Sequence, residues 1–451
     1  MKRSKVSPVW ILICIFDFCL LIFDSHIPPA WPLAKRPPLS PETSGREVKT
    51  PPLTLEACYQ RALKRSEKVQ MEKEDIKAAE AQFFKATGEA VGDMDFVMTF
   101  QKQQELRTGE GGSVSGSFTD PDRRERKFTL QQPIFRGFRA LGALTGAGSL
   151  KKEQKGEWIR AKQLLFLDVA NAFYSLLREK KNLLVLNEVL QLYQERLKDL
   201  EAREQIGRSR ATELVSAKAR MKVAEAERAR AQRTYAVAQD LLEFLTGISL
   251  ENRELQEEPL PETEIQELNG YLEVAPHRAD VEAARQAVKT ARSGVLVAQS
   301  DFWPEVTLEH NRYNRREGLQ ADIDWDLLFK VDVPLFRGGE TVGKVKEAMS
   351  HWRRGKLEYS LAERTATLEI KQAYDQWHSS VAETKALDEA VKASEENFRL
   401  QREDYEHDLV SNLDVLEALE SLERTRLDAN RSYYEMKTNY WNLQIAAGKT
   451  P

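Results

Sequence analysis

The pentapeptide Pro133-Ile134-Phe135-Arg136-Gly137 recurs as Pro334-Leu335-Phe336-Arg337-Gly338, which lies 201 residues further along the chain. The same offset aligns Gly247 with Gly448, so it holds without a gap over more than 110 residues. A fixed offset over this length indicates that the chain contains two copies of one structural unit. The fold is therefore expected to be one plan used twice.

The two copies occupy residues 53–250 and 267–451, and an acidic linker, residues 251–266, joins them. Upstream of the pentapeptides the offset becomes 212, which means that the first copy contains 11 extra residues. We assign these residues to the glycine-rich stretch 109–116, whose composition is typical of a flexible surface loop. The linker is expected to wrap the middle of the helical structure rather than to separate two independent domains.

Period-two alternation predicts β-strands before each pentapeptide. Residues 94–100 alternate between apolar and polar side chains except at Val97, whereas the patterns over 127–132 and 306–310 are weaker. A length of about 10 residues suits a tilted strand that crosses a membrane. A half-buried sheet of a soluble protein fits the alternation equally well. The clearest strand has charged residues between most of its apolar positions, which are Ile323, Trp325, Leu327, Phe329, Val331 and Val333.

The pentapeptides themselves predict strand-to-helix turns. Proline lacks the N–H group that a strand ladder uses, so Pro133 and Pro334 are expected to end the strands. Glycine adopts backbone conformations that other residues avoid, so Gly137 and Gly338 are expected to let the chain bend into a helix. Each copy is therefore expected to contain, in order, a helix, a strand, a loop, a second strand, a very long helix, a tight break and a shorter helix.

Very long helices are predicted after the pentapeptides. Residues 136–206 and 337–408 contain no proline, and about 70 residues of helix would extend roughly 105 Å. Breaks at 207–213 and 408–414 end these helices, and a coiled-coil seam follows each break.

The two seams differ in composition. The first seam consists of ten positions from Leu214 to Leu245, spaced alternately by three and four residues, and nine of the ten side chains are apolar. The corresponding seam from Val415 to Ala446 is smaller and more polar, so its helices are expected to lie close together with wetter contacts. Small side chains favour a sheet of helices over a single apolar core. A filamentous coiled coil would explain the helices but not the strands between them.

The composition excludes several classes of protein. Charged residues make up 31% of the chain, hydrophobic residues 41%, and the mean hydropathy is −0.54, which excludes a helical membrane protein with many spans. The 67 basic and 71 acidic residues are nearly balanced, so no nucleic-acid partner is expected. Three cysteines and six scattered histidines predict neither a disulfide framework nor a metal site, and no cofactor is expected.

The N-terminus has the pattern of a secretory signal peptide over residues 1–34. Three basic residues precede a run of 15 residues that is apolar apart from Asp17, and small residues follow. An uncleaved membrane anchor is the alternative interpretation. Residues 35–52 are rich in proline and are expected to form a linker or an extended strap.

A chain that inserts four strands into a bilayer cannot close a barrel alone. Open strand edges are not tolerated in lipid, and bacterial barrels start at eight strands. The chain is therefore expected to share a barrel with copies of itself. Two copies would give eight strands and an interior filled by side chains, whereas three would give twelve strands and room for a lumen. The strand count leaves the number of copies open.

Four short motifs occur in order along the mature chain. They are Leu53-Thr54-Leu55-Glu56-Ala57, the duplicated pentapeptide, Arg278-Ala279-Asp280 and Leu409-Val410-Ser411-Asn412-Leu413-Asp414-Val415-Leu416. In these motifs the chain resembles the TolC-like outer-membrane efflux proteins over nearly all of its mature length. The resemblance implies a mainly α-helical fold with a transmembrane β part. It implies a homotrimer whose twelve strands form an outer-membrane β-barrel and whose twelve helices continue it as a periplasmic α-barrel.

The same resemblance implies a function. Such proteins are passive exit ducts that lie in the lipid of the outer membrane and extend into the periplasm. They work with a periplasmic adaptor protein and with an inner-membrane pump or ABC transporter. A duct needs no catalytic residue, and the sequence contains no His-Glu-x-x-His, phosphate-loop or Gly-x-Ser-x-Gly motif. An enzyme is therefore not expected.

Acidic residues near the second helix break are the candidate pore residues. The resemblance places acids at the periplasmic mouth of the tunnel, and the matching positions are Asp414 and Glu417. Glu213 is the first-copy counterpart of Asp414. Threefold symmetry would turn each position into a ring of three carboxylates that favours cations. An acid that stabilises an exposed helix N-terminus is the alternative interpretation, and the two roles are compatible.

Both helix breaks are expected to form periplasmic tips. Gly207 allows a left-handed turn, whereas Asp408 stands where the family usually has glycine. Some relatives lock the second tip with an arginine. Val410 occupies that position here, so Arg208 and Arg210 are the candidate substitutes.

The tips are also the candidate contact surface for the adaptor. An exposed Leu-Val pair at a turn fits a partner contact, and a small cap on the helix pair is the alternative. The candidate contact residues are Gly207, Arg208, Ser209, Leu409, Val410 and Ser411.

The competing function is that of a periplasmic coiled-coil adaptor without a pore, but such a protein would have one helical hairpin between compact β domains.

Overall fold

The computed structural model describes residues 52–102, 122–251, 253–261, 265–317 and 320–449, all within one structural unit. The signal peptide predicted for residues 1–34 and the loop predicted at 109–116 lie outside these residues, and so does the linker 35–52 apart from its last residue. Among the described residues, no helix combines the length and the apolar character that a membrane crossing requires.

The described chain is mainly helical and has one sheet. The first copy consists of α2 (Leu55–Arg65), α3 (Glu67–Val91), β1 (Asp93–Lys102), β2 (Asp122–Arg136), α4 (Arg139–Gln205) and α5 (Ala211–Thr246). The second copy consists of α6 (Leu268–Val274), η1 (Ala275–His277), α7 (Ala279–Gln299), η2 (Ser300–Phe302), β3 (Glu305–Arg316), β4 (Trp325–Asp332), α8 (Glu340–Glu406) and α9 (Asn412–Ala446). The predicted strands and long helices are thus present in the predicted order.

The backbone repeats as the sequence does. Helices α4 and α8 each contain 67 residues, and their first residues lie 201 positions apart. Left-handed backbone conformations occur at four pairs of positions with the same offset. These pairs are Gly137 and Gly338, Phe138 and Gly339, Gly207 and Asp408, and Gly247 and Gly448. The duplication therefore extends to the turns that set the direction of each helix.

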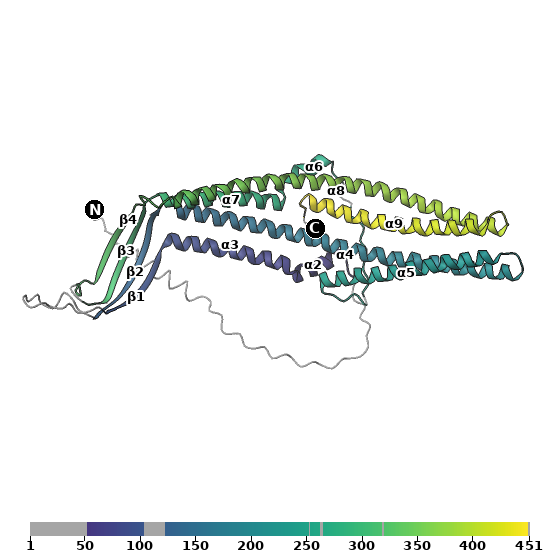
Figure 1. Ribbon diagram of the computed structural model, residues 1–451, viewed down its shortest axis with the longest axis horizontal. Coiled ribbons are helices and arrows are strands. Elements are labelled where there is room, and N and C mark those ends of the chain that lie inside the picture. Colours follow the sequence, from purple (N-terminus) through teal and green to yellow (C-terminus); the bar gives the residue numbers. More distant parts are fainter. Residues whose placement is uncertain (1–51, 103–121, 252, 262–264, 318–319, 450–451) are drawn as a thin grey trace, which may run out of the picture. The chain divides into compact units, whose positions relative to one another are not determined.

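The four strands form one antiparallel sheet in the order β1-β2-β3-β4 (Figure 1). The prediction that proline ends the second strand is wrong in the first copy, because β2 continues through Pro133 to Arg136. The register between β2 and β3 shifts between Pro133 and Phe135, and such a bulge accommodates a proline inside a sheet. In the second copy, β4 ends at Asp332, before Pro334.

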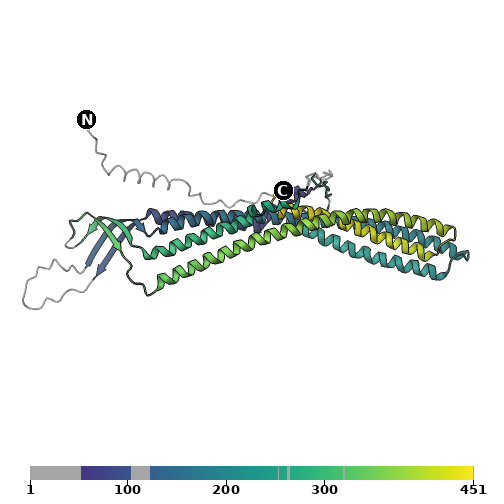
Figure 2. The same cartoon turned by 90° about the horizontal axis from the view of Figure 1, so that it is seen from above.

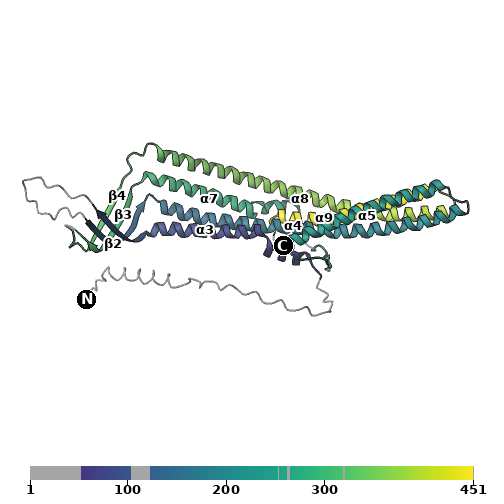
Figure 3. The same ribbon diagram turned by 60° about the horizontal axis from the view of Figure 1, so that its bottom comes forward.

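Four helices continue from the sheet in the same order as its strands. Contacts join α3 to α4, α4 to α7 and α7 to α8, and Figure 3 shows the four helices side by side. Glycine permits the close approach of α4 to α7. A Cβ atom at Gly156 would stand 2.7 Å from the carbonyl oxygen of Ala279, and one at Gly142 would stand 2.9 Å from Val297.

Beyond the middle of α4 and α8, two helical hairpins run to a common end (Figure 2). One hairpin is α4–α5, the other is α8–α9, and the contact between α4 and α9 joins them. The hydroxyls of Thr384 and Ser432 lie 2.9 Å apart across the α8–α9 seam, and Ser394 donates to Thr425 over 3.3 Å. The expectation of polar contacts in the second seam is confirmed.

The described part of the inter-repeat linker lies against the helices. Leu255 forms a parallel bridge with Leu53. Glu257 accepts hydrogen bonds from Tyr433 at 2.9 Å and Tyr434 at 3.1 Å, and it is ion-paired with the buried ammonium group of Lys437. These contacts attach the linker to α9 near the middle of the helical structure.

Candidate functional site at the helical tips

The two tips are built by matching backbone turns. Helix α4 ends at Gln205 and α5 begins at Ala211, and Gly207 between them has a φ of 75°. In the second copy Asp408 takes the corresponding conformation with a φ of 57°. Aspartate adopts this conformation at a cost that glycine avoids. A helix of this length places each tip about 100 Å from the sheet.

Asp414 closes the first turn of α9. Ser411 precedes the helix, and its backbone N–H donates to the Asp414 carboxylate over 2.8 Å, while its hydroxyl donates to the same oxygen over 2.6 Å. These hydrogen bonds form a capping box and hold the pKa of Asp414 below its ordinary value. The structure thus gives Asp414 the helix-capping role, which leaves its side chain exposed at the tip.

The three candidate pore acids do not have the same surroundings. Glu417 is exposed, and because it lies three residues after Asp414 it shares a face of α9 with that residue. Glu213 lies on the other hairpin, is half-buried, and accepts a hydrogen bond from Ser209 over 2.8 Å. Its charge raises the pKa of Tyr405, for which burial is the larger cause. The two α9 acids therefore form one candidate group, and Glu213 faces a different cluster.

That cluster ties the two hairpins together at their tips. Tyr405 of α8 is buried, and the guanidinium groups of Arg196 and Arg203 from α4 lie 3.7 Å and 4.7 Å from the centroid of its ring. Arg196 also donates to the side chain of Asn412 at the start of α9 over 2.9 Å. A cation over an aromatic ring is attracted to it, more strongly where water is excluded. We call Arg196, Arg203, Tyr405 and Asn412 the tip clasp.

Arginines other than those expected make this connection. Arg203 lies 3.8 Å from Asp408, and this ion pair crosses from one tip to the other. In the part of the chain that the structure describes, no ion pair involves Arg208 or Arg210. Sequence reasoning missed Arg196 and Arg203, although their spacing of seven places them on one face of α4.

The turn residues differ in exposure. Val410 packs against the apolar core of the hairpins, which also contains Val415 and Leu416. Leu409 is 73% exposed at the tip, and Gly207 has no atom near the position of a Cβ. The second tip therefore presents Leu409, together with Leu413 of the first turn of α9, to its surroundings, whereas Val410 supports the fold.

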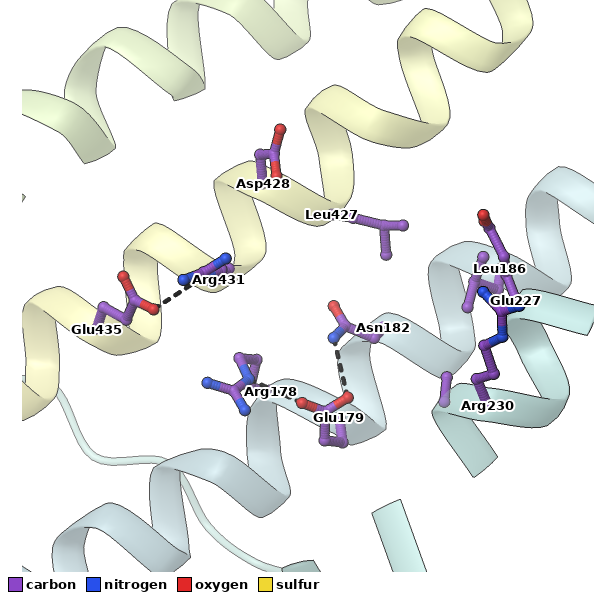
Figure 4. A pocket seen from close by; sticks show the side chains of 11 residues that line it. Arg178, Glu179, Asn182, Leu186, Glu227, Arg230, Leu427, Asp428, Arg431 and Glu435 are labelled. Carbon is purple, nitrogen blue, oxygen red and sulfur yellow. Dashed lines mark hydrogen bonds and ion pairs between the residues drawn. The ribbon is translucent and has the colours of Figure 1, made fainter. Parts of the chain in front are cut away.

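A groove of about 550 Å³ lies between α4, α5 and α9, and its lining side chains mostly carry charges that balance one another (Figure 4). Arg178 and Asn182 donate to Glu179 over 2.8 Å and 3.1 Å, and Arg431 donates to Glu435 over 2.8 Å. Pockets that hold small molecules are usually apolar with a few polar groups. This groove has the opposite character, which suits a wet surface between hairpins.

A model of the outer membrane efflux protein family matches residues 58–248 and 272–449, which together are most of the chain. The chain belongs to the outer membrane efflux protein family. This family consists of channel proteins. The chain is accordingly an outer-membrane exit duct of efflux or type I secretion systems, with a periplasmic extension. The duct function predicted from the sequence is confirmed. The family match does not support the alternative function of an adaptor without a pore.

Individual relatives include both secretion and efflux proteins. The chain is 23% identical over 347 residues to the alkaline protease secretion protein AprF of Pseudomonas aeruginosa, covering 73% of this chain and 70% of AprF. It is 23% identical over 367 residues to the cation efflux system protein CusC of Escherichia coli, covering 75% of this chain and 77% of CusC. Among solved structures, VceC of Vibrio cholerae superimposes with a TM-score of 0.77 at 22% identity, over 88% of this chain and 96% of VceC.

Proposed function

We propose that three copies of this channel protein share one twelve-stranded barrel and one twelve-helix tunnel. The observation that carries this proposal is the sheet order, in which β1 and β4 have partner strands on one side only among the described strands. Lipid offers no hydrogen bonds to such edges, so the β1 edge of one copy must pair with the β4 edge of the next. Three copies supply enough strands for an open lumen, whereas two would give a filled barrel.

At the other end of the tunnel, Asp414 and Glu417 are the proposed lining of the periplasmic aperture. Both are exposed, and threefold symmetry would bring their copies around one axis. The tip clasp holds each α8–α9 hairpin against α4, so its release would let the aperture widen. Glu213 acts in this proposal through the clasp, because it belongs to α5 rather than α9 and its charge helps to raise the pKa of Tyr405, which burial raises more.

The channel is proposed to receive its cargo from an inner-membrane pump or ABC transporter through a periplasmic adaptor. The adaptor would contact the tip turns, where Leu409, Arg208 and Arg210 are exposed and Gly207, Ser209 and Ser411 shape the backbone. AprF is by its name a protein of alkaline protease secretion and CusC a protein of cation efflux. The proposed duct therefore serves either efflux or type I secretion, and the transporter selects the cargo.

The experiment that tests the shared barrel is a measurement of particle mass in mild detergent by light scattering that subtracts the detergent. We expect a particle of three chains that stays in the outer-membrane fraction and forms ion-conducting pores in planar bilayers. A monomer or dimer that is soluble without detergent would refute the shared barrel. A three-chain particle without conductance would refute the open lumen.

A further inference from the structure

The two faces of the sheet differ in chemistry. On one face, polar side chains bind one another across strands: Thr129 donates to Asn311 over 2.8 Å, and Tyr313 donates to Asp326 over 2.8 Å. The other face carries apolar side chains such as Phe96, which packs against Phe128 of the paired strand and is 50% exposed. In an outer-membrane protein this second face is the one that meets lipid.

Four arginines interrupt the apolar face near the start of β2 and the end of β3, which is the end of the strands away from the helices. Arg124 and Arg126 lie on β2, and Arg312 and Arg315 lie on β3. Residues two apart in a strand share a face, and so do residues directly opposite in an antiparallel pair. Because Arg312 stands opposite Phe128 and Arg315 stands opposite Arg126, the four guanidinium groups share the lipid-facing side.

These charges are poorly compensated. Arg315 is paired with Glu317 over 2.6 Å. In the described part of the chain, no carboxylate forms an ion pair with the side chains of Arg124, Arg126 or Arg312. Like charges directly opposite one another destabilise a strand pair, and Arg126 opposite Arg315 is such a case. An anion between them would remove this repulsion.

Arg316, the neighbour of Arg315, provides an internal comparison. It points to the polar face, where Glu125 lies 3.8 Å away and Asp326 lies 3.9 Å away. The sheet thus supplies acids to an arginine on its polar face. Among the described residues, the four lipid-facing arginines have one ion-paired acid, Glu317, which leaves their other N–H donors open to an external anion.

The depth of the arginines follows from the strand register. Arg312 stands opposite Trp325, which is 57% exposed, and exposed tryptophan is typical of the membrane–water interface. The apolar positions of β4 continue from Trp325 towards the helices. A lipid-facing arginine is costly at the middle of the bilayer and nearly free near its surface. The four arginines therefore lie at the level of the head groups in the leaflet away from the periplasmic helices.

We propose that Arg124, Arg126, Arg312 and Arg315 bind the phosphate groups of a glycolipid in the outer leaflet. Arginine presents a planar fork of N–H donors that matches phosphate oxygens in pairs, and neighbouring forks can share one phosphate. The exposed rings of Phe128 and Trp325 lie on the same face and would contact the acyl chains. This assignment rests on the proposed barrel, because it requires the apolar face to meet lipid.

The test uses the full-length protein in detergent with three probes: bisphosphorylated lipid A, the same glycolipid without its phosphates, and inorganic phosphate. Bound lipid is counted by native mass spectrometry. We expect the unmodified protein to bind the bisphosphorylated lipid at least tenfold more tightly than the other two probes. The double variant R126Q/R312Q should lose this preference, and R126K/R312K should keep part of it. The matched control is Arg123→Gln, which removes a charge from the polar face of the same strand and should bind as the unmodified protein does.

The outcomes separate this inference from the barrel proposal. If R126Q/R312Q keeps its mass and conductance but binds phosphorylated lipid as tightly as before, the arginine site is refuted and the barrel stands. Equal binding of the phosphorylated and dephosphorylated lipids would also refute the site, as would an equal loss in R123Q. A failure of the barrel would appear in the particle mass, before any lipid is added.

Discussion

Replacing Glu423 with glutamine should stabilise the protein at alkaline pH and leave its stability unchanged at acidic pH. Glu423 lies on α9 and is 7% exposed, and one of its carboxylate oxygens has no hydrogen-bond partner among the described residues. Burial is the main cause that raises its pKa from 4.5 to about 8, and Glu227 of α5 and Glu420 of its own helix add to the increase. Arg220 is paired with Glu420, and Tyr193 of α4 also faces the group.

The sign and size of the effect follow from proton linkage. The unfolded chain loses the Glu423 proton near pH 4.5, whereas the folded chain keeps it until about pH 8. Stability from this group is therefore complete below pH 4.5 and is lost as the pH rises to about 8. Each unit of pKa difference corresponds to about 1.4 kcal/mol, so the loss is at most about 5 kcal/mol per protomer. We expect about 2–3 kcal/mol, because side chains at the edge of the cluster can turn towards water.

The assay is thermal unfolding of the detergent-purified protein between pH 5 and pH 9. The melting temperature of the unmodified protein should fall between pH 5 and about pH 8 and level off above it, and that of Glu423→Gln should fall less. Glu227→Gln should flatten the curve to a smaller extent, because it removes a neighbouring acid that helps to raise the pKa of Glu423. Glu417→Gln is the control, since it removes an exposed acid from the same helix. Parallel curves for the unmodified protein and Glu423→Gln would show that the reasoning is wrong.

Three further predictions concern the turns and the tips. Gly137→Ala should lower the melting temperature more than Gly338→Ala. Both positions have a positive φ, but only at Gly137 would the new Cβ meet a backbone carbonyl oxygen, that of Ser300, 2.6 Å away. Equal losses of melting temperature in the two variants would contradict this prediction. Tyr405→Leu should raise single-channel conductance, because it removes the aromatic ring on which Arg196 and Arg203 lie and so loosens the tip clasp. Tyr405→Phe keeps the ring and should conduct as the unmodified protein does. Equal conductance of the two variants would refute the role of the tip clasp. Asp414→Ala and Glu417→Ala should each reduce cation preference, measured as a reversal potential in a salt gradient, and an unchanged potential in both would count against the acidic aperture.

Much of the fold could be predicted because it depends on local and periodic features. The alternation of Ile323 to Val333 predicted a strand, and the structure places β4 at Trp325–Asp332. The absence of proline predicted two very long helices, and α4 and α8 have this length. The left-handed turn at Gly207 was also predicted, since glycine is the residue that adopts it without strain.

One wrong prediction and one omission concern contacts between elements. Pro133 was expected to end a strand because it lacks an N–H group, but the register shift beside it lets β2 continue against β3. The role of Arg208 and Arg210 as substitutes for the tip lock stays a prediction. The contact of Arg196 and Arg203 with Tyr405 of the other hairpin was missed, because it joins elements that lie far apart in sequence.

Patterns along the chain were enough to establish the duplicated plan, the order of the strands and helices, and the membership in a family of outer-membrane ducts. These depend on hydrophobic period, on proline and glycine, and on motif order, all of which are visible along one chain. Three-dimensional packing was needed to establish which side chains meet between elements separated by about 200 residues. It paired Arg196 with Asn412, buried Glu423 beside Glu227, and placed Arg126 opposite Arg315, because register and helix packing bring together residues that no local pattern connects.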